Sequence, residues 1–151
     1  MSQGAGPRSP GQAILMLRII GLSLGTGVTL FAFVSWFLHQ QQGPIGEPVY
    51  GSLTFNGALA MAVLAAIGAS FVWRSRVVPV LERPAQETEW QSRAAAIQTG
   101  ALITWALLEG GALVAEVVYF LTANGMAGVL GVVLIWAGIG LTWPKREWLE
   151  G

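Results

Sequence analysis

Four long apolar stretches, separated by polar connections, constrain this chain more than any other feature. They cover about residues 14–38, 54–73, 97–121 and 125–143. A transmembrane helix needs about 20 predominantly apolar residues, and these stretches lack the one-sided periodicity of a helix on a soluble core. We therefore expect an all-α, polytopic membrane protein with four transmembrane helices.

The composition supports a membrane location. Of the 151 residues, 54% are hydrophobic and only 11% are charged, whereas about 25% of the residues in a soluble domain are charged. So few charged side chains could not cover a soluble core of this size. The lipid bilayer is therefore the first expected partner of this chain.

The apolar stretches divide the chain into three parts. Residues 1–12 are rich in Gly, Pro and Ser, and we expect a disordered cytoplasmic tail. Residues 13–143 form the transmembrane domain, and residues 144–151 form a second cytoplasmic tail. The first apolar stretch is longer than the roughly 7–15 residues of a signal peptide, so we expect it to remain as a transmembrane helix.

The basic residues predict the orientation. All eight Lys and Arg residues lie before or early in the first stretch, between the second and third, or after the fourth. The connections 39–56 and 122–124 contain none. We expect the protein in the inner (plasma) membrane of the cell. The positive-inside rule then places both termini on its cytoplasmic side. Arg18, inside the first stretch, is expected to extend its side chain to the interface, and His39 to be a solvated boundary residue.

Two glutamates interrupt the third apolar stretch. Glu109 lies at its middle, and Glu116 follows seven residues later. At about 100° per residue, the two lie within about 20° of each other on one helix face. A charged side chain at the bilayer centre costs about 2.5–3.5 kcal/mol on insertion scales, which makes intramembrane acids candidate functional sites. Both glutamates are therefore candidate proton- or cation-binding residues.

The role of Glu109 has three interpretations. It could exchange a proton or bind a cation, because burial favours the neutral form of a carboxyl group. It could instead bind another membrane component, or it could be a structural acid. As a structural acid, its candidate hydrogen-bond partners are Thr104, Thr26 and Ser23. Glu116 lies closer to the end of the stretch, where it is either part of the site or a hydrated interfacial group.

Small residues recur at four-residue spacing in three of the stretches. Such stripes let helix backbones approach closely, within one chain or between chains, and the sequence does not separate these two cases. The candidate helix-packing residues are Gly21, Gly25, Ala58, Ala62, Ala66 and Gly110.

The first and third stretches also resemble each other. With an offset of 83 residues, Gly27 aligns with Gly110, and residues 36–38 align with residues 119–121. Two hairpins in parallel repeat would produce this pattern. Convergent composition would produce it too, because Leu, Val, Ala and Gly dominate any transmembrane helix.

The segment 106–113 (ALLEGGAL) resembles the ion-carrying helix of the rotary ATP synthase proteolipid, subunit c. Residues 64–69 (LAAIGA) are similar to the small-residue first helix of that subunit. The resemblance covers residues 57–121 and implies that Glu109 is the reversibly protonated carboxyl group. Glu116 and the first and fourth stretches have no counterpart in such a hairpin.

Several classes of function are not expected. The chain has no cysteine and one histidine, which excludes thiol chemistry and a histidine metal site within one chain. No Ser/His/Asp set and no basic patch with interleaved aromatic residues is present. We therefore expect no enzymatic activity, no cofactor, no metal site and no nucleic-acid partner.

Three functions remain. The first is an accessory or structural subunit that uses its acidic stripe to bind other membrane subunits or copies of itself. The second is a proton- or cation-translocating proteolipid that acts through Glu109. The third is an oligomeric small-molecule carrier.

Overall fold

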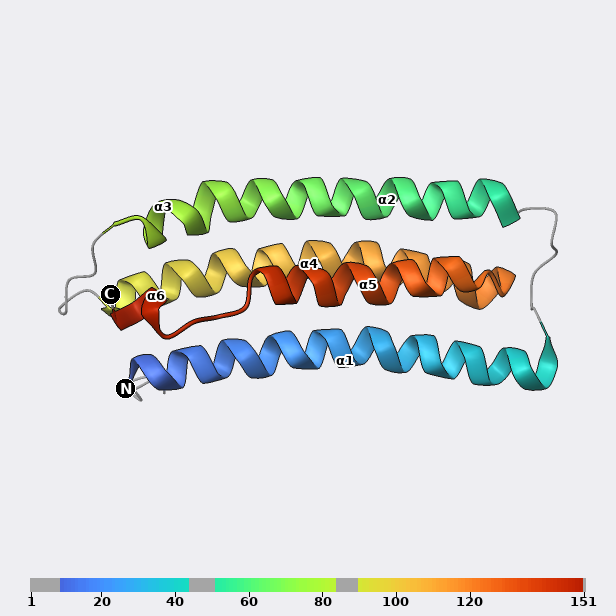
Figure 1. Ribbon diagram of the computed structural model, residues 1–151, viewed down its shortest axis with the longest axis horizontal. Helices are drawn as coiled ribbons and strands as arrows, with labels where there is room; N and C mark the ends of the chain where they lie inside the picture. The colour runs from blue at the N-terminus through green and yellow to red at the C-terminus, as the bar shows by residue number, and fades with distance from the viewer. Residues whose placement is uncertain (1–8, 44–50, 84–89, 151) are drawn as a thin grey trace, which may run out of the picture.

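The computed structural model describes residues 9–43, 51–83 and 90–150 as one elongated bundle of helices (Figure 1). A π-helical turn, Trp73–Val77, joins the second helix to the third. The helices in chain order are α1 (Pro10–Gln42), α2 (Gly51–Val72), α3 (Val78–Leu81), α4 (Trp90–Thr122), α5 (Gly125–Leu141) and α6 (Glu147–Glu150).

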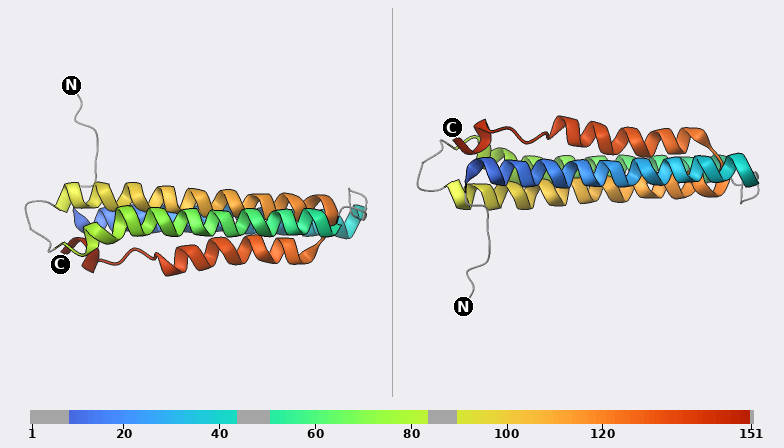
Figure 2. Two further views of the ribbon diagram at one scale, coloured as in Figure 1. Left: turned by 90° about the horizontal axis from the view of Figure 1, so that it is seen from above. Right: turned by 90° about the horizontal axis from the view of Figure 1, so that it is seen from below.

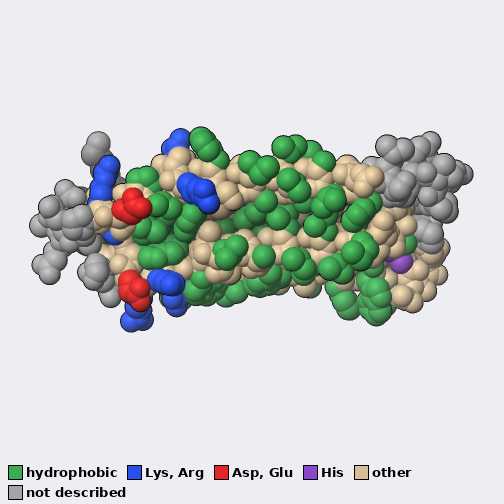
Figure 3. All heavy atoms as spheres, turned by 45° about the horizontal axis from the view of Figure 1, so that its top comes forward, with side chains coloured by type: hydrophobic (Ala, Val, Ile, Leu, Met, Phe, Trp, Pro, Cys, Tyr) green, Lys and Arg blue, Asp and Glu red, His purple; other side chains and the backbone are tan. Residues whose placement is uncertain are grey.

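The expected all-α fold is confirmed, and its helices are compatible with a membrane protein. Three helical segments, Pro10–Gln42, Phe55–Leu81 and Trp90–Thr122, are long and apolar enough to cross a membrane. The fourth, α5, is apolar but has only 17 residues. Large apolar side chains cover the outside of the bundle (Figure 3), as expected for helices that face lipid rather than water.

Helix α4 is the central element of the bundle. It packs along α1, α2 and α5, whereas α1 and α2 lie on opposite sides of the α4–α5 pair (Figures 1 and 2). The beginning of α1, the beginning of α4 and the short α6 lie at one end. The Lys and Arg side chains visible in Figure 3 gather toward this same end, which we call the basic end; the other is the far end.

Two tryptophans fit against glycines of α1 and hold the bundle together. Trp105 of α4 is fully buried, and its ring would lie 3.3 Å from a Cβ atom placed on Gly21. Trp136 of α5 lies as close as 2.9 Å to a Cβ atom placed on Gly25. Gly21 and Gly25 therefore pack within the chain, because a larger side chain would collide with an indole ring.

The helix boundaries correct two expectations. Helix α1 begins at Pro10, and Ser9 caps it by accepting a hydrogen bond from the Gln12 amide at 3.3 Å, so the expected disordered tail does not extend to residue 12. Residues 1–8 lie outside the described part. The second segment does not end at Trp73 but continues through the π-helical turn to the end of α3.

A short turn joins α4 to α5. Asn124 caps α5 by accepting a hydrogen bond from the Met126 amide at 3.1 Å. The internal repeat stays a prediction. Helices α1 and α4 both have 33 residues, but α4 packs along α5 while α1 and α2 lie apart.

Arg18 contacts the segment that follows α5, and its extension to the membrane interface stays a prediction. Its Nε and Nη2 atoms donate hydrogen bonds to the carbonyl oxygen of Pro144 at 3.1 and 2.9 Å, and the guanidinium lies 5.5 Å from the centre of the Trp143 ring. Helix α5 stops at Leu141, and residues 143–145 have no regular secondary structure. Arg18 supplies hydrogen-bond donors to this irregular backbone, which a chain inside a bilayer must satisfy with its own groups.

A second arginine holds the same C-terminal segment. Arg93, near the start of α4, donates hydrogen bonds to the carbonyl oxygens of Trp148 at 2.6 Å and Arg83 at 2.6 Å. It also reaches the carbonyl of Leu81 at 3.3 Å. Arg93 therefore connects the end of α3 to α6 at the basic end.

Replacing Arg18 with Met should destabilise the bundle. The substitution keeps the apolar stem but leaves the Pro144 carbonyl without its donor, and an unsatisfied buried acceptor costs about 1–3 kcal/mol. We expect that decrease in the free energy of unfolding, measured by circular dichroism during titration with a denaturing detergent. Arg76→Met is the control, since Arg76 is exposed, and it should change stability by less than about 0.5 kcal/mol. Equal stability of the two variants would contradict the role given to Arg18.

Candidate functional site

Glu116 is the buried acid among the residues whose side chains the structure describes. Its side chain is 0% exposed, and neither carboxylate oxygen has a hydrogen-bond partner in the described part of the chain. It packs against α5 at Gly131, where an added Cβ atom would lie 2.6 Å from Oε1. The interpretation of Glu116 as a hydrated interfacial group is therefore wrong, because α5 closes over it.

Other polar side chains surround the same region at the far end. The ring of Tyr119, three residues after Glu116 on α4, lies 5.2 Å from the ring of His39 on α1. Ser35 precedes His39 by four residues and therefore shares its helix face. We call Ser35, His39, Glu116 and Tyr119 the far-end polar cluster. It is assembled by two helices, α1 and α4, that run in the same direction.

Helix α5 makes room for this cluster with two glycines. A Cβ atom on Gly128 would lie 2.8 Å from the ring of Tyr119, and Gly131 faces Glu116 in the same way. The two glycines are three residues apart, as are the two α4 side chains that they accommodate. The close contact between α4 and α5 at this end therefore requires residues without side chains on α5.

The cluster contains all the buried polar side-chain atoms that lack a partner among the described residues. These atoms are Ser35 Oγ, His39 Nδ1 and the two carboxylate oxygens of Glu116. His39 is not the solvated boundary residue that we expected, since it is half-buried and its Nε2 atom donates to the carbonyl oxygen of Phe120 at 2.8 Å. Unpaired buried polar atoms are costly, so their concentration in one place marks this cluster as the candidate site.

The chemistry of the cluster suits protons better than metals. A carboxyl group buried without a partner favours its neutral form, because a buried unpaired charge is strongly disfavoured. Among the described residues, no group of three or more His, Cys, Asp or Glu side chains could hold a metal ion.

Glu109 lies in a different environment. It is half-buried and has no hydrogen-bond or ion-pair partner in the described segments. Of its expected partners, Thr104 donates to the carbonyl of Gly100 at 2.8 Å and Ser23 to that of Ile19 at 2.8 Å. The hydroxyl groups of Thr104 and Ser23 therefore donate to backbone carbonyls and not to Glu109.

The face of α4 that carries Glu109 can be located from its neighbours. Phe120 follows Glu109 by eleven residues, which places the two within about 20° on the helix, and Phe120 packs against Phe31 of α1 with ring centres 6.2 Å apart. Glu109 therefore lies on the side of α4 that faces α1, at the edge of the buried surface. The two acids share a face as the sequence predicts, but only Glu116 is enclosed by α5.

Some of the candidate helix-packing residues are buried inside the bundle, and others are exposed on its surface. Ala58 and Ala62 of α2 are buried. Gly110 is exposed and has no atom within 4 Å of an added Cβ atom. Its neighbour Gly111 packs within the chain instead, where a Cβ atom would lie 2.6 Å from that of Ala65. Gly110 therefore does not pack within this chain, and its packing against another chain stays a prediction.

The sequence analysis missed the polar pairs that fix the bundle. The indole of Trp105 donates to Thr142 Oγ1 at 2.8 Å, and the indole of Trp136 donates to Thr29 Oγ1 at 2.9 Å. The signal was available, since tryptophans normally favour the membrane interfaces and these two lie inside apolar stretches. An internal tryptophan needs both a glycine for its ring and an acceptor for its N–H group.

No protein family model, curated protein or solved structure matches this chain. The resemblance of residues 57–121 to the subunit c hairpin therefore stays a prediction from sequence.

Replacing Gly131 with Ala should separate α4 from α5. The new Cβ atom would lie 2.6 Å from Glu116 Oε1 and 2.8 Å from the backbone oxygen of Ala112. Overpacking of this kind costs about 1–3 kcal/mol, measured as the free energy of unfolding in mixed detergent micelles. Gly140→Ala on the same helix has open space and should be neutral. The described packing at Glu116 would be contradicted if both variants were equally stable.

Proposed function

We propose that this protein is a non-enzymatic integral membrane protein with four transmembrane segments and both ends on the cytoplasmic side of the inner (plasma) membrane. The gathering of Lys and Arg toward one end of the bundle supports this orientation (Figure 3). Helix α5, with 17 residues, is at the lower limit for a membrane span. The irregular segment after α5 then spans the rest of the bilayer. Arg18 donates hydrogen bonds to the Pro144 carbonyl in this segment.

Within the membrane, the protein acts as an accessory or structural subunit that binds other membrane subunits or copies of itself through α4. The observation that carries this proposal is Glu109, which is half-buried in the middle of α4 and has no partner among the described residues. A polar side chain left open to lipid is costly, whereas a donor on a neighbouring helix would remove that cost. Glu109 therefore fits a contact with a second transmembrane helix.

The residue beside Glu109 supports the same conclusion. Gly110 is exposed with open space around it, and the exposed Ala106 lies four residues before it on the same face. Small residues at this spacing let a partner helix approach closely enough for a hydrogen bond between side chains. A hydrogen-bond donor such as Ser, Thr, Asn, Lys or Arg on the partner helix would suit Glu109.

Changes at Glu109 and Gly110 should release the partner without unfolding the protein. Interhelical hydrogen bonds contribute about 1–2 kcal/mol in model peptides, so Glu109→Leu should weaken association about tenfold, and Gly110→Leu should block close approach. Native gel electrophoresis of mild-detergent membrane extracts would report the shift from complex to free protein, alongside energy transfer between labelled copies. Gly140→Leu, at another exposed open position, is the control. An unchanged complex in both α4 variants would refute binding through this face.

A second candidate function is the handling of a proton through an intramembrane carboxyl group. The specific observation in its favour is the far-end polar cluster, in which Glu116 is fully enclosed and its oxygens are unpaired. The sequence resemblance assigned this role to Glu109, but the burial favours Glu116. Proton exchange would proceed through His39, which is the titratable residue of α1 in the cluster; α5 contributes no titratable side chain.

This alternative makes a separate prediction. If Glu116 carries a proton, the infrared band of a protonated carboxyl group should be present at neutral pH and absent in Glu116→Gln. Proton uptake by liposomes that contain the protein should be lost in Glu116→Gln and retained in Glu109→Gln. Loss of uptake only in Glu109→Gln would support the subunit c resemblance instead, and no uptake by the wild type would leave binding as the sole proposed function.

A further inference from the structure

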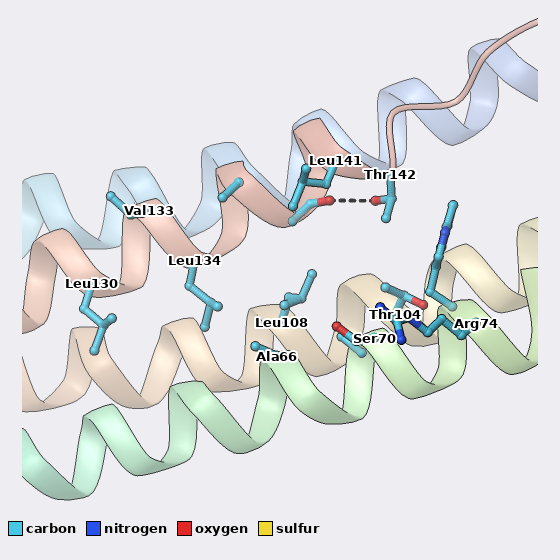
Figure 4. A pocket seen from close by; sticks show the side chains of 14 residues that line it. Ala66, Ser70, Arg74, Thr104, Leu108, Leu130, Val133, Leu134, Leu141 and Thr142 are labelled. Carbon is cyan, nitrogen blue, oxygen red and sulfur yellow. Dashed lines mark hydrogen bonds between the residues drawn. The ribbon is translucent and has the colours of Figure 1, made fainter. Parts of the chain in front are cut away.

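A groove lies between α2, α4 and α5 in the half of the bundle nearer the basic end. Its volume is about 470 Å³, and most of its lining is apolar. Leu130, Val133 and Leu134 of α5 form one wall, and α2 faces them with the small side chain of Ala66 (Figure 4). The lining residues Val133, Ala137 and Leu141 are exposed along α5, so the groove is accessible from the side of the bundle, where lipid would contact it.

The groove exists because several of the residues that line it are small. Ala66 and Ala69 of α2 and Ala137 and Gly138 of α5 line it. Gly138 contacts Leu108, the large α4 side chain that rises between the two helices. With small residues on both sides, α2 and α5 leave a space that their side chains do not fill.

One end of the groove is polar. Figure 4 shows Arg74, Ser70 and Thr104 grouped at the end nearest Thr142, where α5 stops. Thr104 and Thr142 use their hydroxyl hydrogens within their own helices. Arg74 has no hydrogen-bond partner among the described residues, so its guanidinium is the cationic group free to bind a ligand at this end.

The π-helical turn positions Arg74. The turn Trp73–Val77 contains both Arg74 and Val77. Val77 is fully buried against Gly100 of α4, while Trp73 and Arg74 line the groove. Turns of this kind rearrange the side chains of a helix and occur frequently at functional sites. Here the turn fixes α2 to α4 and places a cation at the groove's polar end.

We propose that this groove binds an anionic phospholipid, with one acyl chain along the apolar walls and the phosphate on Arg74. The lateral opening and apolar lining suit a hydrocarbon chain, and the polar end lies toward the basic end, where headgroups would be. Basic pockets between transmembrane helices on the cytoplasmic side bind anionic headgroups. The site is independent of the proposed binding through Glu109, because no lining residue of the groove belongs to that face.

The experiment is native mass spectrometry of the full chain in detergent, titrated with phosphatidylglycerol and with phosphatidylcholine of the same acyl chains. We expect the wild type to retain phosphatidylglycerol preferentially. Arg74→Gln should reduce this preference about fivefold, the effect of one basic residue near an anionic headgroup. Arg76→Gln is the matched control, since Arg76 is exposed in the same turn but does not line the groove, and it should keep the preference.

A second variant tests the chain-binding part of the groove. Ala137 is exposed and lines the groove, so Ala137→Leu should fill it without disturbing the core and should reduce the binding of both lipids. Ala60→Leu, at an exposed position of α2 outside the lining, should leave binding unchanged, and circular dichroism verifies the fold of each variant. Equal retention of the two lipids, equal effects of Arg74→Gln and Arg76→Gln, or unchanged binding in Ala137→Leu would each overturn the proposal. A dimer that Ala137→Leu dissociates, without loss of lipid, would mean that a second copy occupies the groove.

Discussion

The hydrogen bonds from Arg18 to the Pro144 carbonyl are the interaction on which the rest of the structure depends. A bilayer offers no water to backbone groups, so irregular backbone is tolerated only where the protein supplies partners. Helix α5 ends early, and the segment after it would otherwise expose its carbonyl groups. Arg18 holds this segment beside α1, Trp105 donates to Thr142 at the end of α5, and the C-terminal residues return to the basic end.

The same constraint explains the two different environments of the acids. Glu116 is enclosed by α5, which is possible because Gly131 has no side chain. Glu109, seven residues earlier on the same face, lies at the edge of the packed surface and is half-buried. In lipid a buried carboxyl group is stable when neutral, and a half-exposed one is stable when a partner covers it. These requirements support the proposed binding of another helix through Glu109 and, as the alternative, proton exchange through Glu116.

Much of the fold could be predicted from the sequence, but the arrangement of the site could not. The apolar stretches and the all-α character follow from local hydropathy and segment length. The burial of Glu116, the hydrogen bonds of Arg18 to Pro144 and the outward position of Gly110 required the structure. Each of these depends on which side of a helix faces its neighbours, and a helix that is apolar on all sides carries no polar face to indicate this.

The sequence by itself determined that the chain forms membrane-compatible helices, because segment length and hydropathy are local properties. It also placed both acids on one side of α4, because the helical repeat is fixed. Tertiary structure alone decided how each helix is rotated about its axis. That rotation is set by the packing of large side chains against glycines, as Trp105 packs against Gly21 and Trp136 against Gly25. Such packing exists only once two helices meet.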